Sequence, residues 1–217
     1  DAEGDGGRRV FDTTLYRLRR SIGDDALLRL VDGKLHLDDR LCWVDLWAFE
    51  ELLTKVDKAI APGGQERDVI DLAERLLDLY RGPLLADTPA PSAHLLRPRA
   101  ALSTKFFRAA GKLGQALETH QQFDQAALLY QRAAEGEDAL ELAYAGLIRC
   151  ALGSGRHAEG VRLYEQCRSR MIANLGEEPG PALAQLYATL GAPPLLPPVW
   201  TGGRAVAAEN KAHPHRQ

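Results

Sequence analysis

Basic and hydroxyl side chains between residues 12 and 22 carry the chemistry that is easiest to interpret in this chain. Thr13, Tyr16, Arg17 and Arg20 fall on one side of a helix drawn over this segment, and Arg19 falls on its flank. Guanidinium and hydroxyl groups bind phosphate oxygens and base edges, so such a face could contact nucleic acid. On the chemistry of these residues alone, a solvated basic face on a structural helix is the simpler interpretation.

Motifs for catalysis, cofactor binding or metal binding are missing from the sequence. It contains no P-loop, no dinucleotide-binding glycine motif, no GxSxG elbow and no HExxH pair. The six histidines are scattered, and no pair has the spacing of metal ligands on a helix. Cys42, Cys150 and Cys167 form no CxxC motif and are expected to be small buried residues in a reducing compartment. We expect a protein that is not an enzyme and that needs no cofactor and no metal.

The overall composition is ordinary for a globular protein. The 217 residues carry 27 Lys and Arg against 30 Asp and Glu, a net charge of −3. Any contact with nucleic acid must therefore come from a local basic patch. No apolar run approaches the roughly 20 residues needed to cross a bilayer, and no signal peptide opens the chain. These features predict a cytoplasmic protein with no membrane partner.

A helix over residues 12–22 is needed to present the basic face. Its apolar positions recur at helical spacing and would point inward, and they are Phe11, Leu15, Leu18 and Ile22. Arg17 and Arg20 then point the other way. Gly23 is expected to end the helix.

A β-hairpin is expected directly after this helix. Asp32-Gly33 lies between two alternating runs and is a strong turn signal, because both turn positions need positive φ. The alternation places four leucines on one face and pairs Leu28 with Leu37 and Leu30 with Leu35. The other face, toward solvent or a partner, carries Arg29, Lys34 and His36. A helix followed by a two-stranded wing is the second half of a winged helix.

A repeat of 34 residues predicts the architecture of the rest of the chain. Leu129-Tyr130 aligns with Leu163-Tyr164, and small residues align on both sides of these pairs. Helical sequence with this period is the tetratricopeptide signature, in which helical hairpins bury their apolar faces by stacking. Tyr130 and Tyr164 are expected in the core, although they could instead line a peptide groove. Gly114 would let two helices approach closely.

Start and stop signals divide residues 41–191 into helices joined by short turns. The first is expected to begin at about Asp45 as its N-cap and to bury Leu53 among its apolar residues. Pro98 is expected in the first turn of a longer helix. The predicted helices cover about 45–60, 66–80, 98–120, 124–135, 139–152, 157–174 and 181–190, with turns near 120–123, 136–139 and 153–156. Residues 192–217 lack apolar periodicity and are predicted to be a disordered tail.

The order of these elements resembles a known bacterial arrangement. A response-regulator-type winged helix is followed by a bacterial transcriptional activator domain in actinomycete antibiotic regulatory proteins and in large regulators with a nucleotide-binding module. The resemblance covers nearly residues 10–191. It rests on Leu15-Tyr-Arg-Leu-Arg-Arg20, Asp32-Gly-Lys-Leu35, Leu79-Tyr-Arg-Gly-Pro-Leu-Leu85, Leu163-Tyr164 and Gly176-Glu-Glu-Pro-Gly-Pro181.

The resemblance implies roles for the basic residues. Residues 12–22 match the recognition helix, which enters the major groove of DNA. Arg17 and Arg20 would read bases or phosphates, with Thr13 and Tyr16 beside them, and Arg19 would reach a phosphate or pair with an acid. On the wing, Arg29, Lys34 and His36 could touch phosphates or could simply be solvated.

The resemblance also implies an organisation and a function. The expected fold is mainly all-α, with tetratricopeptide-like repeats after the C-terminal half of a winged helix. The expected domains are a partial winged helix (1–40), an activator domain (41–191) and the tail. The chain would be the C-terminal region of a longer regulator that binds promoter DNA, while its repeats contact a protein partner or an upstream domain. A tetratricopeptide adaptor without DNA binding is the alternative, and an exposed apolar stripe on residues 11–22 leaves a homo-oligomer open.

Overall fold

The computed structural model describes residues 2–61, 63–87, 92–136 and 140–191. Within them the chain is mainly helical, as the sequence predicts. The elements in chain order are α1 (Ala2–Ile22), β1 (Leu28–Val31), β2 (Lys34–Leu37), α2 (Asp45–Ala59), α3 (Glu66–Leu79), α4 (Ala93–Thr119), α5 (Phe123–Ala134), α6 (Leu140–Gly153), α7 (His157–Leu175) and α8 (Pro181–Thr189).

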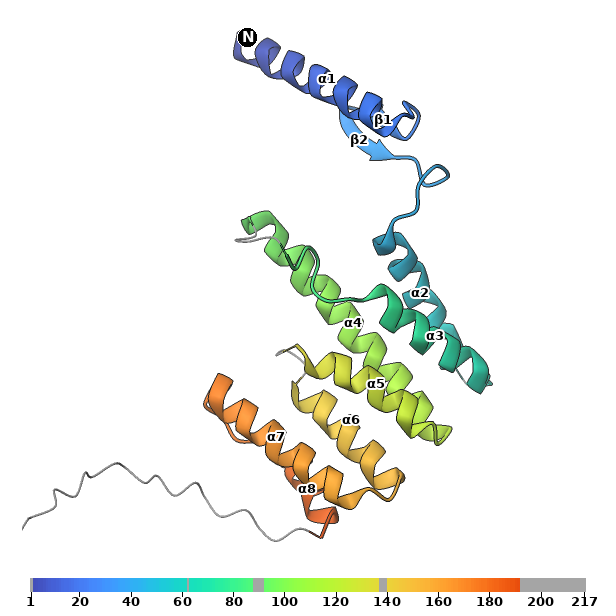
Figure 1. Cartoon of the computed structure of the whole chain (residues 1–217), viewed down its shortest axis with the longest axis vertical. Helices are drawn as coiled ribbons and strands as arrows, with labels where there is room; N and C mark the ends of the chain where they lie inside the picture. Colours follow the sequence, from blue (N-terminus) through green and yellow to red (C-terminus); the bar gives the residue numbers. More distant parts are fainter. Residues whose placement is uncertain (1, 62, 88–91, 137–139, 192–217) are drawn as a thin grey trace, which may run out of the picture.

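Helices α2 to α7 form three hairpins that stack one upon the next (Figure 1). Helix α4 packs against α2, α3, α5 and α6, and the short α8 covers α6 and α7 at the end of the stack. The predicted turns near 120–123 and 153–156 are confirmed. The predicted turn near 136–139 lies partly outside the described residues. The predicted tail lies wholly outside them.

Tyr130 and Tyr164 are buried, as the 34-residue period predicts, since only 1% and 7% of their surfaces are exposed. Tyr130 lies between two glycines: a Cβ atom on Gly114 or on Gly146 would come within 2.5 Å of its ring. Tyr164 stacks on Tyr187, with ring centroids 4.1 Å apart. Gly114 therefore permits the close approach that the sequence predicts.

A polar cluster provides hydrogen-bond partners for the buried hydroxyl group of Tyr130. Its hydroxyl donates to Glu118 Oε1 at 2.6 Å, and Arg149 donates to both carboxylate oxygens of Glu118 at 2.8 and 2.9 Å. Burial, followed by the neighbouring Glu118 carboxylate, raises the pKa of Tyr130. Helices α4, α5 and α6 are thus joined by charge-assisted hydrogen bonds as well as by apolar packing.

Two predicted helix starts and one predicted N-cap are wrong. Helix α1 begins at Ala2 instead of residue 12, because no proline interrupts it and each added residue contributes one more backbone hydrogen bond. Helix α4 begins at Ala93, so Pro98 lies inside the helix rather than in its first turn. Asp45 is the first helical residue of α2, and Val44 occupies the N-cap position. In α2, Leu52 rather than Leu53 joins the fully buried core.

The helix and hairpin at the N-terminal end lie apart from the stacked repeats (Figure 1). Leu15 of α1 and Leu28 of β1 are buried. The remaining members of the predicted inward stripe, Phe11, Leu18 and Ile22, are exposed, as are Leu30, Leu35 and Leu37 of the hairpin. The predicted apolar faces therefore form, but most of their surface is open.

Candidate nucleic-acid interface

The basic face of α1 is presented to solvent. Arg17 and Arg20 are exposed on the side of the helix away from the buried Leu15. Tyr16 and Thr13 are also exposed. The Thr13 hydroxyl donates to the Arg9 carbonyl at 2.8 Å, so its free lone pairs can accept a hydrogen bond. The face offers guanidinium donors and the hydroxyl groups of Thr13 and Tyr16 to a partner.

Arg19 differs from its basic neighbours because it holds the hairpin. Its Nε and Nη2 atoms donate to the Leu28 carbonyl oxygen at 3.1 and 2.5 Å. The contact places Leu28 beside the inward side of α1, where Leu15 is buried. The sequence led us to expect a phosphate or an acid as the partner of Arg19, and the structure gives it a backbone carbonyl instead. Arg19 lies on the flank of α1, closer to the apolar stripe than Arg17, and its side chain can therefore reach β1.

The hairpin has the predicted register. Leu28 pairs with Leu37 and Leu30 with Leu35, while Arg29 pairs with His36 and Val31 with Lys34. Asp32 and Gly33 adopt φ values of 51° and 74°, the positive values that this turn requires. The polar face therefore carries the three predicted residues Arg29, Lys34 and His36, all of them exposed.

Asp38, at the end of the hairpin, was not singled out by sequence reasoning. Its carboxylate accepts hydrogen bonds from Arg40 Nε at 3.0 Å and Arg40 Nη2 at 2.8 Å, and it forms an ion pair with Arg29 Nη1 at 3.4 Å. The Asp38 carbonyl also accepts hydrogen bonds from the Leu41 amide and the Cys42 thiol. The hydrogen bonds from Arg40 hold the pKa of Asp38 well below its usual range. An acid two residues before an arginine was the signal available.

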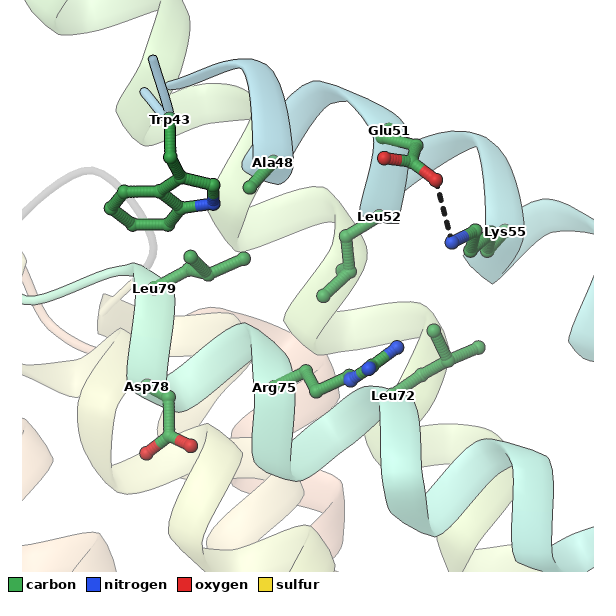
Figure 2. A pocket seen from close by; sticks show the side chains of 9 residues that line it. All are labelled: Trp43, Ala48, Glu51, Leu52, Lys55, Leu72, Arg75, Asp78 and Leu79. Carbon is green, nitrogen blue, oxygen red and sulfur yellow. Dashed lines mark ion pairs between the residues drawn. The ribbon is translucent and has the colours of Figure 1, made fainter. Parts of the chain in front are cut away.

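A groove between α2 and α3 lies on the first hairpin of the repeats, with a volume of about 340 Å³. Figure 2 shows the Trp43 indole beside Ala48 and Leu79 at one end, and the Glu51–Lys55 ion pair at the other. The side chain of Arg75 extends along the groove toward Leu72 (Figure 2). Trp43 is 73% exposed, unusual for so large an apolar side chain. Such a mixed apolar and charged groove can hold a peptide segment.

The described part of the chain contains no group of three or more His, Cys, Asp or Glu residues placed to hold a metal ion. Among those same residues, no helix combines the length and apolar character that a membrane span requires. Cys150 and Cys167 are buried as predicted, and Cys42 is half-buried.

Comparison with known proteins identifies similar sequences and folds. The model of a family described as bacterial transcriptional activator domain matches residues 44–190. The regulatory protein AfsR of Streptomyces griseus is 30% identical over 183 residues, which cover 80% of this chain and 18% of AfsR. The chain thus spans less than a fifth of that relative. The structure of Mycobacterium tuberculosis EmbR in complex with a low-affinity phosphopeptide matches with a TM-score of 0.56 at 20% identity, covering 85% of this chain and 50% of that chain. At this identity the likeness concerns the fold.

Proposed function

The chain belongs to the bacterial transcriptional activator domain family, and on this premise we propose that it serves a bacterial transcription regulator as a DNA-contacting and regulatory region. The proposed role is binding rather than catalysis. The observation that carries it is the exposed basic face of α1, held next to a two-stranded wing by Arg19.

The proposed DNA-contacting unit consists of residues 1–40. Arg17 and Arg20 would enter the major groove with Thr13 and Tyr16 beside them, because Leu15 and the rest of the apolar stripe claim the opposite side of α1. Arg29 and Lys34 of the wing would contact phosphates. Arg19 would act indirectly, by fixing the wing against the helix.

The proposed regulatory unit consists of residues 41–191. Stacked helical hairpins offer an extended surface to a protein or to another domain of the regulator. The groove beside Trp43 supports this role, since exposed aromatic residues are enriched at protein interfaces. EmbR, a protein of similar fold, was solved in complex with a low-affinity phosphopeptide, which is consistent with a peptide or protein partner.

Titration of the 217-residue chain with duplex DNA tests the proposal. We expect weak binding without sequence preference, because the apolar stripe of α1 is mostly exposed and further packing partners would be needed to fix the orientation of the helix. Affinity should fall steeply with salt, and Arg17→Ala and Arg20→Ala should weaken it. Arg162→Ala on the exposed face of α7 is the matched control and should have no effect.

Failure of the folded chain to bind any duplex at low salt would contradict the DNA-binding role. It would favour the second candidate, a protein-interaction adaptor, for which the groove beside Trp43 is the supporting observation. Tight, sequence-selective binding by the chain alone would contradict the expectation that α1 needs further packing partners.

A further inference from the structure

Asp38 has an unusual environment for an acid in this protein. In the part of the chain that the structure describes, it is the one charged residue that is buried. Its side chain is 4% exposed, yet its two partners, Arg29 and Arg40, are 56% and 77% exposed. A buried carboxylate thus anchors two guanidinium groups that reach the surface from different segments, β1 and the linker before α2.

The two arginines retain donors for another ligand. Arg40 uses Nε and Nη2 for Asp38, and Arg29 uses Nη1. A guanidinium group carries five N–H donors in a planar fork, so each arginine keeps several of them. The charged residues here, Arg29 and Arg40 against Asp38 and Asp39, sum to no net charge, so the site offers oriented guanidinium donors rather than an excess of positive charge.

An open cavity of about 720 Å³ lies next to these donors. It is bounded by the polar face of the hairpin, with Arg29 and His36, and by Arg40 and Trp47 on the other side. Asp39 also lines it. Planar guanidinium donors beside a histidine and an indole ring are suited to an oxyanion attached to an aromatic or sugar-bearing group.

We propose that Arg29 and Arg40 form a phosphate-binding site for a phosphodiester group of the DNA backbone, and that Asp38 is the positioning residue that orients both guanidinium groups. The inference rests on the proposed DNA-binding function and extends it to residues of the linker. Arg40 and Trp47 lie outside the helix and wing, so the site carries the DNA contact across the boundary toward the repeats.

Two observations favour a backbone phosphate over a small free anion. The cavity is wide and open, whereas sites for small ligands enclose most of the ligand surface. It also continues the wing face that carries Arg29, Lys34 and His36. A polyanion can be held by several such weak contacts in a row, each releasing counterions.

The positioning role of Asp38 is tested by a pair of charge-removing variants in the full chain. Asp38→Asn and Asp39→Asn each remove one negative charge next to the same cavity. If only the net charge beside the cavity mattered, both variants would bind the negatively charged duplex more tightly. If Asp38 orients the arginines, Asp39→Asn should bind a mixed-sequence duplex more tightly, whereas Asp38→Asn should bind it more weakly. Tighter binding by Asp38→Asn would overturn the positioning role.

The phosphate contact itself is tested by the salt dependence of duplex binding. Each phosphate contact contributes a slope of about 0.9, so Arg40→Ala should reduce the ratio of affinities between 50 and 200 mM salt by about threefold. Arg40→Lys keeps the charge without the fork and should restore only part of the affinity. Arg162→Ala is the control, and circular dichroism confirms that every variant is folded.

The outcomes separate this inference from the proposed function. If wild type binds duplex and Arg17→Ala weakens it, while Arg40→Ala changes neither affinity nor slope, the phosphate site is wrong and the DNA-binding role survives. If wild type binds no duplex, both fail. Binding of inorganic phosphate or of a phosphothreonine peptide that depends on Arg40, without an Arg40-dependent duplex contact, would also overturn the assignment to DNA.

Discussion

Two glycines of α4, only three residues apart, have different surroundings. A Cβ atom on Gly114 would lie 2.5 Å from the Tyr130 ring, whereas one on Gly111 would lie 3.6 Å from the end of Leu142. Tyr130 cannot swing away, because Gly146 and Glu118 hold it from other sides. We expect Gly114→Ala to lower the free energy of unfolding by about 1–3 kcal/mol. Gly111→Ala should instead raise it by about 0.5–1 kcal/mol through better helix propensity. Urea unfolding of both variants measures the difference, and equal effects would contradict the packing account.

Two buried thiols make stability sensitive to alkaline pH. Burial raises the pKa of Cys150 to about 12 and that of Cys167 to about 11, against an ordinary value of 9.0. The thiols have a higher pKa in the folded protein than in the unfolded chain, so their burial stabilises the fold fully below pH 9. This stabilisation is lost as the pH rises from 9 toward the pKa values of the folded protein. Each thiol should cost at most about 1.4 kcal/mol per pH unit in this window. Unfolding by urea at pH 9 and pH 10 should show the loss, and the Cys150→Ala/Cys167→Ala variant should show a shallower one. An unchanged pH dependence in that variant would exclude the thiols as its source.

At the scale of elements, the loop between α7 and α8 decides whether α8 docks. Glu141 at the start of α6 accepts a hydrogen bond from the Gly180 amide at 2.8 Å, next to the first residue of α8. The ion pair between Arg168 of α7 and Glu178 of this loop is partly exposed and is expected to contribute little. Glu141→Ala leaves the Gly180 amide without this acceptor and should cost about 1–2 kcal/mol. Hydrogen exchange should accelerate in α8, where Leu183 and Tyr187 are buried. Glu165→Ala, on the exposed side of α7, is the control. Unchanged protection of α8 in Glu141→Ala would show that apolar packing alone holds the helix.

At the scale of the whole molecule, the helix–hairpin unit and the stacked repeats differ in how they are held. Arg19 joins α1 to the hairpin by hydrogen bonds to the Leu28 carbonyl, and Leu15 and Leu28 are the buried apolar residues described in this unit. In contrast, α4, α5 and α6 share a continuous core. The free energy needed to open a region locally increases with the number of apolar contacts that it buries. We expect α1 amides to exchange with solvent much faster than those of α4 to α6, by hydrogen exchange followed with mass spectrometry. Binding of duplex DNA should slow exchange in α1, the hairpin and the linker before α2, but not in α4 to α6. Equal protection of α1 and α4 in the free chain would contradict two separately held units.

Features set by neighbouring residues could be predicted from the sequence by itself. The hairpin register follows from the alternation around Asp32-Gly33, and the burial of Tyr130 and Tyr164 follows from a period of 34 residues. The helices of the repeats were predicted within a few residues of their observed bounds. The exceptions, such as the start of α4 ahead of Pro98, occur where a local signal was weaker than continued helix formation.

Contacts between distant residues were decided only by the tertiary structure. Stacking of α4, α5 and α6 brings Arg149 to the carboxylate of Glu118, which lies 31 residues earlier in the chain. Asp38 looks like an ordinary surface acid until the hairpin brings Arg29 beside it, and Arg19 finds a carbonyl rather than an acid. The groove beside Trp43 depends on how α2 and α3 pack. Periodicity reports which face of an element is apolar, but the partner of a polar side chain depends on the angle and offset between elements, which no local pattern encodes.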